Sequence, residues 1–492
     1  MTSRRLLALS ALCAPLLAIL VGTGGCAKVL GDNQPREADP AVPEAWAVPA
    51  EYMQGAPTSN AAQQQWDQFF TDPNLRALIQ EAVDNNQELG IRMQEIVISQ
   101  AEVGGRRGEY LPNLDAYAGA GIEKVSANSS PGVSDEANGV PANLPFLGFG
   151  LSASWEIDIW GKLRNAAKAA NQRYLASIEA KNFVLTQIIA EIASSYYELL
   201  TLDAQIEVLE RNLQIQKDAL DVVKLQKQAA QVTELAVQRF EAEVLKNQGL
   251  RFDLEQRRIE AENRINFLCG RYPQPVARSS GNFRTTEPPR VGAGLPAELL
   301  DNRPDIREAE LRLEGAKLDA KSAKAQFYPS LSLEAGVGYE SFNARHLLQT
   351  PQSLVYNLAG NLVAPLLNRA AIKADYRMAN AEQIQAVLEY ERTVLWAYTE
   401  IVNTLSMVEN LRLRFEKQQQ QVERLEAAIE TSNTLFRSAR ADYMEVLLTR
   451  RDALEAEMEL LETRKAQMLA VVELYRALGG GWRMPESGTT GN

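Results

Sequence analysis

The sequence contains very little histidine and cysteine, the residues on which many metal centres and nucleophilic catalytic sites depend. Its 492 residues include one histidine, His346, and three cysteines. A histidine-ligated metal site and a Ser-His or Cys-His nucleophile therefore lack their parts. The G-x-x-x-x-G-K-[ST] phosphate loop is also missing. These absences argue against an enzyme, so we predict no catalytic residue, no metal site and no cofactor.

The chain also lacks the positive charge that nucleic-acid binding requires. Its formal net charge is −12, whereas a protein that binds nucleic acid needs a concentrated basic face to neutralise phosphate. After the N-terminal run at 6–21, no apolar run is long enough for a membrane-spanning helix. We therefore expect no nucleic-acid partner, and any membrane contact must use another kind of structure.

The N-terminus has the order of a secretory signal. Arg4 and Arg5 precede the apolar run, and small residues and then Cys26 follow it. This layout looks like a bacterial lipoprotein signal, in which Cys26 would become the acylated first residue. Thr23 stands where such signals usually have Leu, so cleavage by the ordinary signal peptidase near Ala27 is an alternative. We predict a signal peptide at 1–25.

Residues 26–65 follow the signal and carry five prolines. Because proline removes backbone donors and disfavours helix, this segment is either an extended lipidated tether or packs on the outside of the body. Ala27-Lys28 lacks the Asp that signals inner-membrane retention in such lipoproteins, which favours delivery to the outer membrane. Cys269 has no partner for a disulfide, so we expect a small buried apolar residue there.

Most of the remaining chain consists of an internal repeat, in which one unit occurs twice. The run Asn86 to Leu89 aligns with Arg303 to Ile306, and Leu111 to Leu114 aligns with Tyr328 to Leu331, both at an offset of 217. A repeat of this length indicates a duplicated supersecondary unit that closes around a shared axis. We predict a first repeat at 66–270, a linker at 271–297, a second repeat at 298–482 and a disordered tail at 483–492.

Apolar and polar residues alternate in two segments of each repeat. The four segments are 114–123, 147–160, 331–340 and 354–366. Segments of about ten residues with this period are typical of transmembrane β-barrel strands. A soluble, half-buried sheet predicts the same alternation, but the signal peptide and the missing membrane helix favour the barrel. Four strands cannot close a barrel alone, and three chains would supply 3 × 4 = 12.

The alternation assigns each strand residue to a face. We expect one set to face lipid, namely Leu151, Trp155, Leu333 and Val337. The neighbouring set should face water, namely Ser152, Glu334 and Gly338. In an outer-membrane barrel the apolar residues point outward to lipid and the polar residues point inward.

The remaining sequence predicts unusually long helices. From Gly161 to Ala229 there is no proline and no further glycine. Apolar residues recur there every seven positions, as they do in the second repeat: Ile192, Leu199, Ile206, Leu213 and Leu220; Val394, Ile401, Val408, Phe415, Val422, Ile429 and Phe436; Leu447, Leu454, Leu461, Met468 and Tyr475. A strict period of seven specifies left-handed supercoiled packing of helix on helix.

Three motifs carry a family resemblance. The run Leu299 to Glu310, which contains Arg303-Pro304-Asp305, resembles the signature of the TolC-like outer-membrane factors, in the OprM/NodT lipoprotein branch that serves RND-type efflux pumps. Trp66 to Leu75 and Trp160-Gly161-Lys162 also match the family pattern. The resemblance implies a mainly α fold with a membrane β-barrel. Three chains would form a 12-stranded barrel, four strands each, continuous with a long periplasmic α-helical barrel.

The function implied by the resemblance is a passive trimeric conduit of a tripartite efflux system, which exports small molecules across the periplasm and the outer membrane. Its partners would be a periplasmic adaptor, an inner-membrane transporter of RND type and outer-membrane lipid. One alternative is a channel for a protein-secreting or ABC-type exporter. Another is a lipid-anchored periplasmic coiled-coil scaffold without a pore, although such a scaffold would not need glycine-lined strands.

By the same resemblance, the periplasmic gate lies where the second helical hairpin turns. Glu445 stands where an acidic residue would contribute to a ring of three, and Leu448 would form an apolar collar beside it. Asp442 and Glu445 also fit a capping box at a helix start, and both roles can coexist. Arg440 is a candidate for holding the tip closed by charge-assisted bonds to a neighbouring acid such as Glu234.

The Arg303-Pro304-Asp305 run has a structural interpretation of its own. Pro304 fits the first turn of a helix, and Asp305 would face the positive end of the helix dipole. Asp301 or Asn302 can cap the same helix. We therefore predict a helix start here and no substrate site.

Overall fold

The computed structural model describes residues 36–39, 41–53, 57, 59–279, 281, 283–367, 369–438, 440 and 443–483. The predicted signal peptide, Cys26, Asp442 and the tail beyond Arg483 lie outside them. The chain divides into two compact units. The first, here called the sheet unit, comprises Val97–Leu175, Glu310–Glu389 and residues 36–38. The second, here called the helical unit, comprises Asp39–Ile96, Ala176–Ala309 and residues 390–483.

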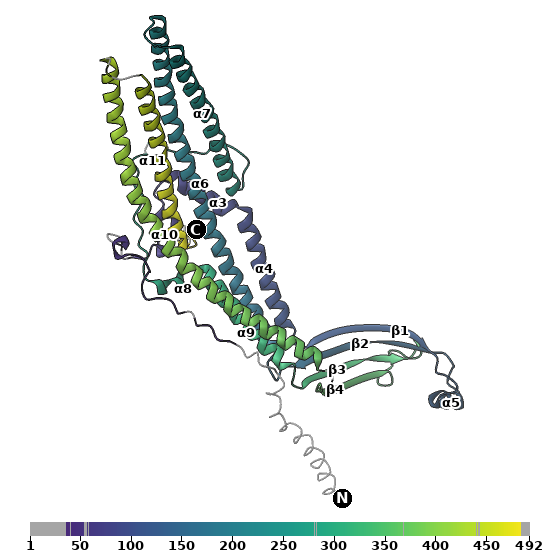
Figure 1. Cartoon of the computed structure of the whole chain (residues 1–492). Helices are drawn as coiled ribbons and strands as arrows, with labels where there is room; N and C mark the ends of the chain where they lie inside the picture. The colour runs from purple at the N-terminus through teal and green to yellow at the C-terminus, as the bar shows by residue number, and fades with distance from the viewer. Residues whose placement is uncertain are drawn as a thin grey trace, which may run out of the picture. The chain divides into compact units, whose positions relative to one another are not determined.

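The elements occur in the same order in both halves of the chain (Figure 1). The first half contains α3 (Pro73–Asn85), α4 (Gln87–Gly108), β1 (Asn113–Glu123), β2 (Leu144–Ile157), α6 (Lys162–Gln228) and α7 (Glu234–Leu268). The second contains α8 (Leu299–Asn302), α9 (Pro304–Ala325), β3 (Ser330–Ser341), β4 (Leu354–Val363), α10 (Ala370–Arg437) and α11 (Tyr443–Ala477). Helices α4 and α9 start 304 − 87 = 217 residues apart, which confirms the internal repeat.

Several short helices lie outside this repeated order. They are the 3-10 helices Ala50–Met53, Ala61–Gln63 and Pro296–Glu298, and the helices α2 (Trp66–Phe69) and α5 (Ser130–Ala137). Trp46 stacks on Tyr398 with ring centroids 5.4 Å apart, and its Nε1 donates to the carbonyl of Gly294 at 2.9 Å. Of the two alternatives for 26–65, the described residues after 40 thus follow the second, because they pack against the helical unit.

Two helices have the length that the sequence predicts. Helix α6 has 67 residues and α10 has 68, and neither contains proline or glycine. At a rise of about 1.5 Å per residue each extends roughly 100 Å. Gly161, with φ of +77°, turns the chain into α6, and Gly270, with φ of +68°, follows the end of α7. No described helix combines the length and apolar character needed to cross a membrane.

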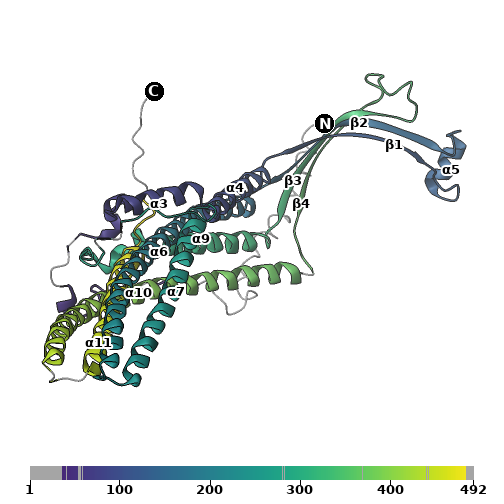
Figure 2. The same ribbon diagram turned by 90° about the horizontal axis from the view of Figure 1, so that it is seen from above.

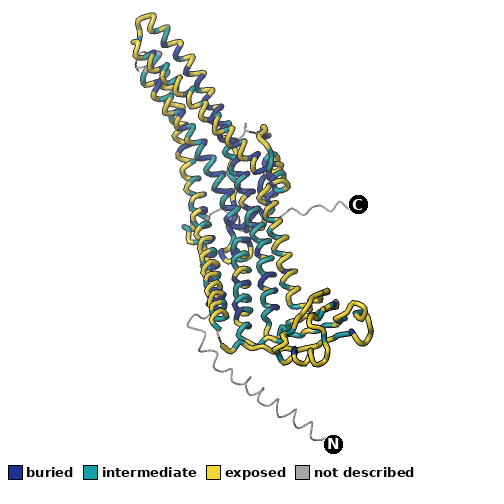
Figure 3. Tube along the Cα trace, turned by 90° about the vertical axis from the view of Figure 1, so that its right-hand side faces the viewer, coloured by how far each residue is buried: buried dark blue, intermediate teal, exposed yellow. Residues whose placement is uncertain are grey.

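The seven-residue rows form the core of the helical unit. In α6 and α11 the described members of these rows are buried, from Ile192 to Leu220 and from Leu447 to Tyr475. In α10, Val394, Ile401 and Val422 are buried while the others of the row are partly exposed. Figure 3 shows the buried positions along the long helices, and Figure 2 shows the two hairpins, α6 with α7 and α10 with α11. Cys269 is buried and free, as predicted, and burial raises the pKa of its thiol to about 11.

The four strands form one antiparallel sheet in the order β1-β2-β3-β4. Their positions agree with the alternating segments to within one residue except at three ends, of which the first is the start of β2 at Leu144, three residues before the predicted start. The segment 147–160 was expected to be strand throughout, but β2 ends at Ile157 because the chain bends there and the N–H of Ile159 donates to the carbonyl of Ile157. Strand β4 ends at Val363, two residues before Pro365, which has no N–H for the ladder.

Candidate functional site

The register of the sheet gathers apolar side chains on one face. Residues that are directly paired in an antiparallel sheet point to the same side. Leu151 pairs with Ala116 and with Val337, and Trp155 pairs with Leu333. The full set on this face is Leu114, Ala116, Ala118, Ala120 and Ile122; Pro145, Leu147, Phe149, Leu151, Ala153, Trp155 and Ile157; Leu331, Leu333, Ala335, Val337, Tyr339 and Ser341; Leu354, Tyr356, Leu358, Gly360 and Leu362. The structure therefore brings together the four residues predicted to face lipid.

This apolar face is open in the single chain. Tyr356 is 82% exposed, Leu358 80% and Ile122 77%, and the sheet is largely yellow in Figure 3. Soluble proteins rarely expose a continuous apolar surface of this kind unless it binds a membrane or a partner. No described residue of the single chain covers this face, so a membrane or a partner must cover it.

The opposite face is polar and carries charge of one sign. It contains Ser152, Glu334 and Gly338, the three residues predicted to face water. The four strands include five acids, Asp115, Glu123, Glu156, Glu334 and Glu340, and their sequences contain no lysine or arginine. All five lie on this face by register. A surface with this charge attracts cations and repels anions.

The two outer strands each keep one unpaired edge. Strand β1 pairs only with β2, and β4 pairs only with β3, among the strands that the structure describes. An edge presents a row of free N–H and C=O groups, which cannot remain unpaired in a membrane. The sheet is therefore built to be continued on both sides.

Aromatic residues mark the ends of the strands that adjoin the helices of the sheet unit. Trp160 stacks on Tyr328 with ring centroids 4.7 Å apart, and its Nε1 donates to the carbonyl of Pro329 at 2.8 Å. The Nε1 of Trp155 donates to the carbonyl of Tyr110 at 2.9 Å. Aromatic rings with a satisfied polar tip are typical of the boundary between lipid and water.

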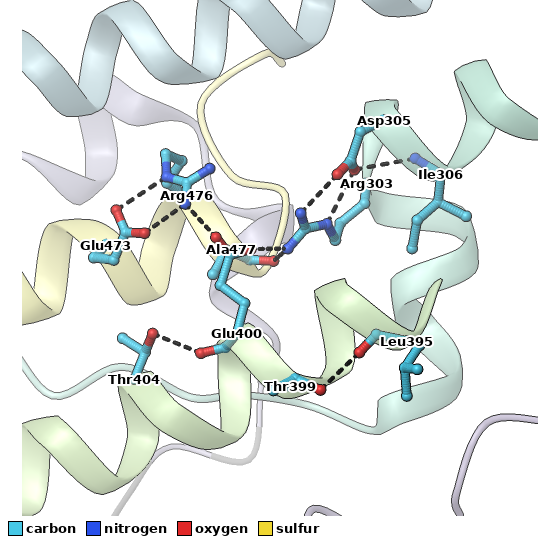
Figure 4. A network of polar contacts seen from close by, with 10 residues as sticks. All are labelled: Arg303, Asp305, Ile306, Leu395, Thr399, Glu400, Thr404, Glu473, Arg476 and Ala477. Atoms are coloured by element: carbon cyan, nitrogen blue, oxygen red, sulfur yellow. Dashed lines mark hydrogen bonds and ion pairs between the residues drawn. The ribbon is translucent and has the colours of Figure 1, made fainter. Parts of the chain in front are cut away.

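The Arg303-Pro304-Asp305 run anchors a buried ion cluster in the helical unit (Figure 4). Arg303 is 2% exposed, and its guanidinium bonds Asp305 at 2.7 and 3.0 Å, Glu400 at 2.6 Å and the carbonyl of Ala477 at 2.6 Å. Arg476 bonds the same Glu400 at 2.5 Å. Burial lowers the pKa of Arg303, but Asp305 and Glu400 more than reverse this and hold its pKa above the ordinary value. The cluster ties the start of α9 to α10 and α11.

The predicted capping of this helix start is wrong in one respect. Pro304 is the first residue of α9, as expected. Asp301 and Asn302, however, are the last residues of α8 and so precede the position of a cap. The carboxylate of Asp305 instead accepts the backbone N–H of Ile306 at 3.0 Å. Asp301 and Asn302 belong to the short helix α8 instead, and the sequence pattern did not predict this helix.

Those predicted gate residues that the structure describes lie at the turns of the two hairpins. Glu234 is in the first turn of α7, and its carboxylate forms an ion pair with Lys227 at the end of α6. Arg440 is exposed in the turn before α11, and its backbone N–H donates to the carbonyl of Leu435 at 2.9 Å. Arg239 of α7 donates to the sulfur of Met444 at 3.7 Å, so the two turns adjoin. A bond from Arg440 to Glu234 remains a prediction.

Glu445 and Leu448 both line a shallow groove between α10 and α11. Glu445 is exposed in the first turn of α11, and Leu448 is 40% exposed. The groove also contains Thr431 and Leu435 of α10. Asp442 lies outside the described residues, so its capping box with Glu445 stays a prediction. The gate roles therefore remain predictions.

Two features of the site escaped the sequence analysis. The first is the ion cluster, because the partners Glu400 and Arg476 lie far from Arg303 in the sequence. The second is the pair Tyr117 and Phe146, aromatic residues that the register places on the polar face. The sequence did contain a sign of this aromatic pair, because each residue interrupts a row of polar residues and a glycine lies two positions away.

Comparisons with known proteins agree with this architecture. The family model described as "Outer membrane efflux protein" matches residues 78–271 and 295–480. The pyoverdine export outer membrane protein OpmQ of Pseudomonas aeruginosa is 30% identical over 454 residues, 92% of this chain and 94% of OpmQ. The cation efflux system protein CusC of Escherichia coli (strain K12) is 28% identical over 420 residues, 85% of this chain and 88% of CusC. A crystal structure of CusC superposes with a TM-score of 0.80 at 25% identity, covering 92% of this chain and 100% of that one.

These findings confirm the predicted fold class, a mainly helical chain with four membrane-type strands and an internal repeat. They also confirm the predicted place and role, a channel of an efflux system in the outer membrane that reaches into the periplasm. Members of this group are conduits and not enzymes, in agreement with the sequence prediction. The family model covers well over half of the chain. The chain belongs to the outer membrane efflux protein family.

Proposed function

We propose that three copies of the chain close their sheets into one 12-stranded barrel, which forms the outer-membrane part of a conduit. One observation carries this proposal: a sheet with one apolar and one acidic face keeps an unpaired edge on β1 and another on β4. Pairing β4 of one copy with β1 of the next removes every edge. The apolar faces then point to lipid and the acidic faces line the pore.

The native mass of the detergent-purified protein tests this closure. We expect three copies per particle. Cysteines placed at the β1 and β4 edges should cross-link between copies and not within one, since the two strands lie at opposite ends of the sheet order. A dimer, or a cross-link only within one chain, would contradict the proposed closure.

The proposed partners are a periplasmic adaptor and an inner-membrane transporter of RND type. The family membership and the efflux names of OpmQ and CusC support a tripartite system. The conduit holds no nucleotide loop or metal cluster among its described residues, so transport energy would come from the inner-membrane partner. A channel for an ABC-type or protein-secreting exporter would have the same shape, and the proteins cross-linked to the chain in cells decide between them.

We further propose that Cys26 is acylated and anchors the chain as an outer-membrane lipoprotein. The order of charged, apolar and small residues before Cys26 supports this. Mass spectrometry of the mature N-terminal peptide should show acyl chains. An unmodified N-terminus that begins after Cys26 would refute the modification.

The periplasmic gate is proposed at the hairpin turns. In the trimer three copies of Glu445 would form an acidic ring, Leu448 an apolar collar beside it, and Asp442 a further acid. Arg440 would hold the tip closed by a bond to Glu234, for which it must compete with Lys227.

The variants Glu445→Gln and Arg440→Ala test these gate roles. Glu445→Gln should reduce cation selectivity and weaken block by multivalent cations, because it removes three charges from the ring. Arg440→Ala should raise conductance by loosening the closed tip. Glu455→Gln, an exposed acid further along α11, is the matched control. If single-channel recordings show wild-type conductance, selectivity and block in both test variants, the gate lies elsewhere.

A further inference from the structure

Two aromatic rings lie on the acidic face of the sheet, where the alternation calls for polar residues. Phe146 is 44% exposed and Tyr117 is 39% exposed. Phe146 pairs with Gly121, and Tyr117 pairs with Gly150, which in turn pairs with Gly338. The register thus places both rings on the side of Ser152 and Glu334, opposite to the lipid-facing set.

Glycines on this face leave room for both rings beside the sheet. A Cβ added at Gly150 would lie 3.1 Å from Cε1 of Tyr117, and one added at Gly338 would lie 2.9 Å from its hydroxyl. Tyr117 therefore lies across β2 toward β3. A Cβ at Gly148 would lie 3.0 Å from Cζ of Phe146. Each ring thus lies against glycine on one side and stays partly open to the pore side, since both rings are more than one third exposed.

One acid, Glu340, lies beside the Phe146 ring. The same Cβ at Gly148 would lie 3.2 Å from Cγ of Glu340, so this carboxylate stem and the ring are no more than about 6 Å apart, a separation that one cation can bridge. The ring lies toward Gly148 and Gly119, because a Cβ added at Gly119 would lie 3.7 Å from Cε1 of Phe146, and so it points away from Glu123, the other diagonal neighbour of Phe146 in β1. The strand sequences contain no basic residue to neutralise Glu340.

An aromatic face beside a carboxylate is the combination that recognises organic cations. The ring quadrupole attracts a cation over its face, and the apolar ring excludes water from alkyl or aryl substituents. We propose that Phe146, Tyr117 and Glu340 form a binding site for aromatic or alkyl ammonium compounds in the wall of the conduit. The site rests on the proposed function, because it requires this face to line the pore, and it gives the conduit a preference of its own for lipophilic cations.

Block of single-channel current by benzyltrimethylammonium, added on the extracellular side, tests the site. We expect block of the wild type, about five-fold weaker block of Phe146→Leu through the lost cation–π contact, and weaker block of Glu340→Gln. Leu retains an apolar cover over the glycines, so the sheet should still form. Phe146→Trp keeps a π face and should keep the block. Benzoate, an anion of similar size, should block none of them.

Phe149→Leu is the matched control, since Phe149 lies on the apolar face and stacks on Tyr339 at 5.7 Å. Its block should equal that of the wild type. Wild-type block in both Phe146→Leu and Glu340→Gln, with normal conductance, overturns the site and leaves the conduit intact. A purified protein that passes no current overturns the proposed function and the site with it.

Discussion

Leu333→Lys is expected to destabilise the membrane sheet by about 1–2 kcal/mol, whereas Ser332→Lys, one residue away, is expected to be tolerated. Leu333 pairs with Trp155 near the aromatic boundary, and the full cost of about 2–4 kcal/mol applies at the midplane. Leu333 lies between Trp155 and Gly360 on the apolar face, and Ser332 lies between Glu156 and Asn361 on the acidic face. A lysine in lipid must lose its hydration, while a lysine in the pore stays in water and gains two acidic or polar neighbours.

Thermal dissociation of the purified oligomer, followed on gels, measures this difference. Both variants introduce the same residue into the same strand, so strand propensity cancels between them. Equal expression and equal heat stability of the two variants would contradict the assignment of the faces.

Arg303→Met should cost about 3–5 kcal/mol, because removing one partner of a buried ion cluster leaves uncompensated charge. Methionine fills much of the space of the arginine stem, so most of the loss is electrostatic. Asp305 would lose both of its bonds from the guanidinium, and Glu400 would keep only Arg476. The start of α9 would then be held less firmly against α10 and α11.

Denaturant unfolding followed by circular dichroism measures this loss. Arg307→Met is the control, since Arg307 lies one turn further along α9, its side chain is 45% exposed, and it meets Glu179 at only 3.6 Å. Exposed pairs contribute up to about 1 kcal/mol. If the two variants shift the unfolding midpoint equally, the cluster does not stabilise the fold as its geometry suggests.

The sequence predicted those parts of the fold that depend on local periodicity. The alternation of Leu331 to Glu340 has a period of two and places each side chain on a face, and the seven-residue row of α6 places Ile192 and Leu199 in the core. Both patterns follow from backbone geometry alone. The internal repeat was equally visible, because both copies keep their order and spacing.

The parts that escaped prediction depend on contacts between distant residues. Glu400 lies 97 positions from Arg303, and no periodicity links them. The helix α8 takes Asp301 and Asn302 away from their expected capping role. Phe146 lies before the glycine that it covers, and only the register shows that Glu340 of another strand meets it there. Contacts between distant residues decided the first and the last of these features, and a local helix that the pattern did not predict decided the second.

The acidic face of the sheet should line an aqueous pore, and thiol modification of two adjacent residues measures whether it does. Ser152→Cys and Leu151→Cys differ by one position in β2 and lie on opposite faces. A charged, water-soluble methanethiosulfonate reagent should reduce the single-channel current of Ser152→Cys and leave that of Leu151→Cys unchanged, with the wild type as the control for native cysteines. A current reduced only in Leu151→Cys, or in neither variant, would show that the acidic face does not line the pore.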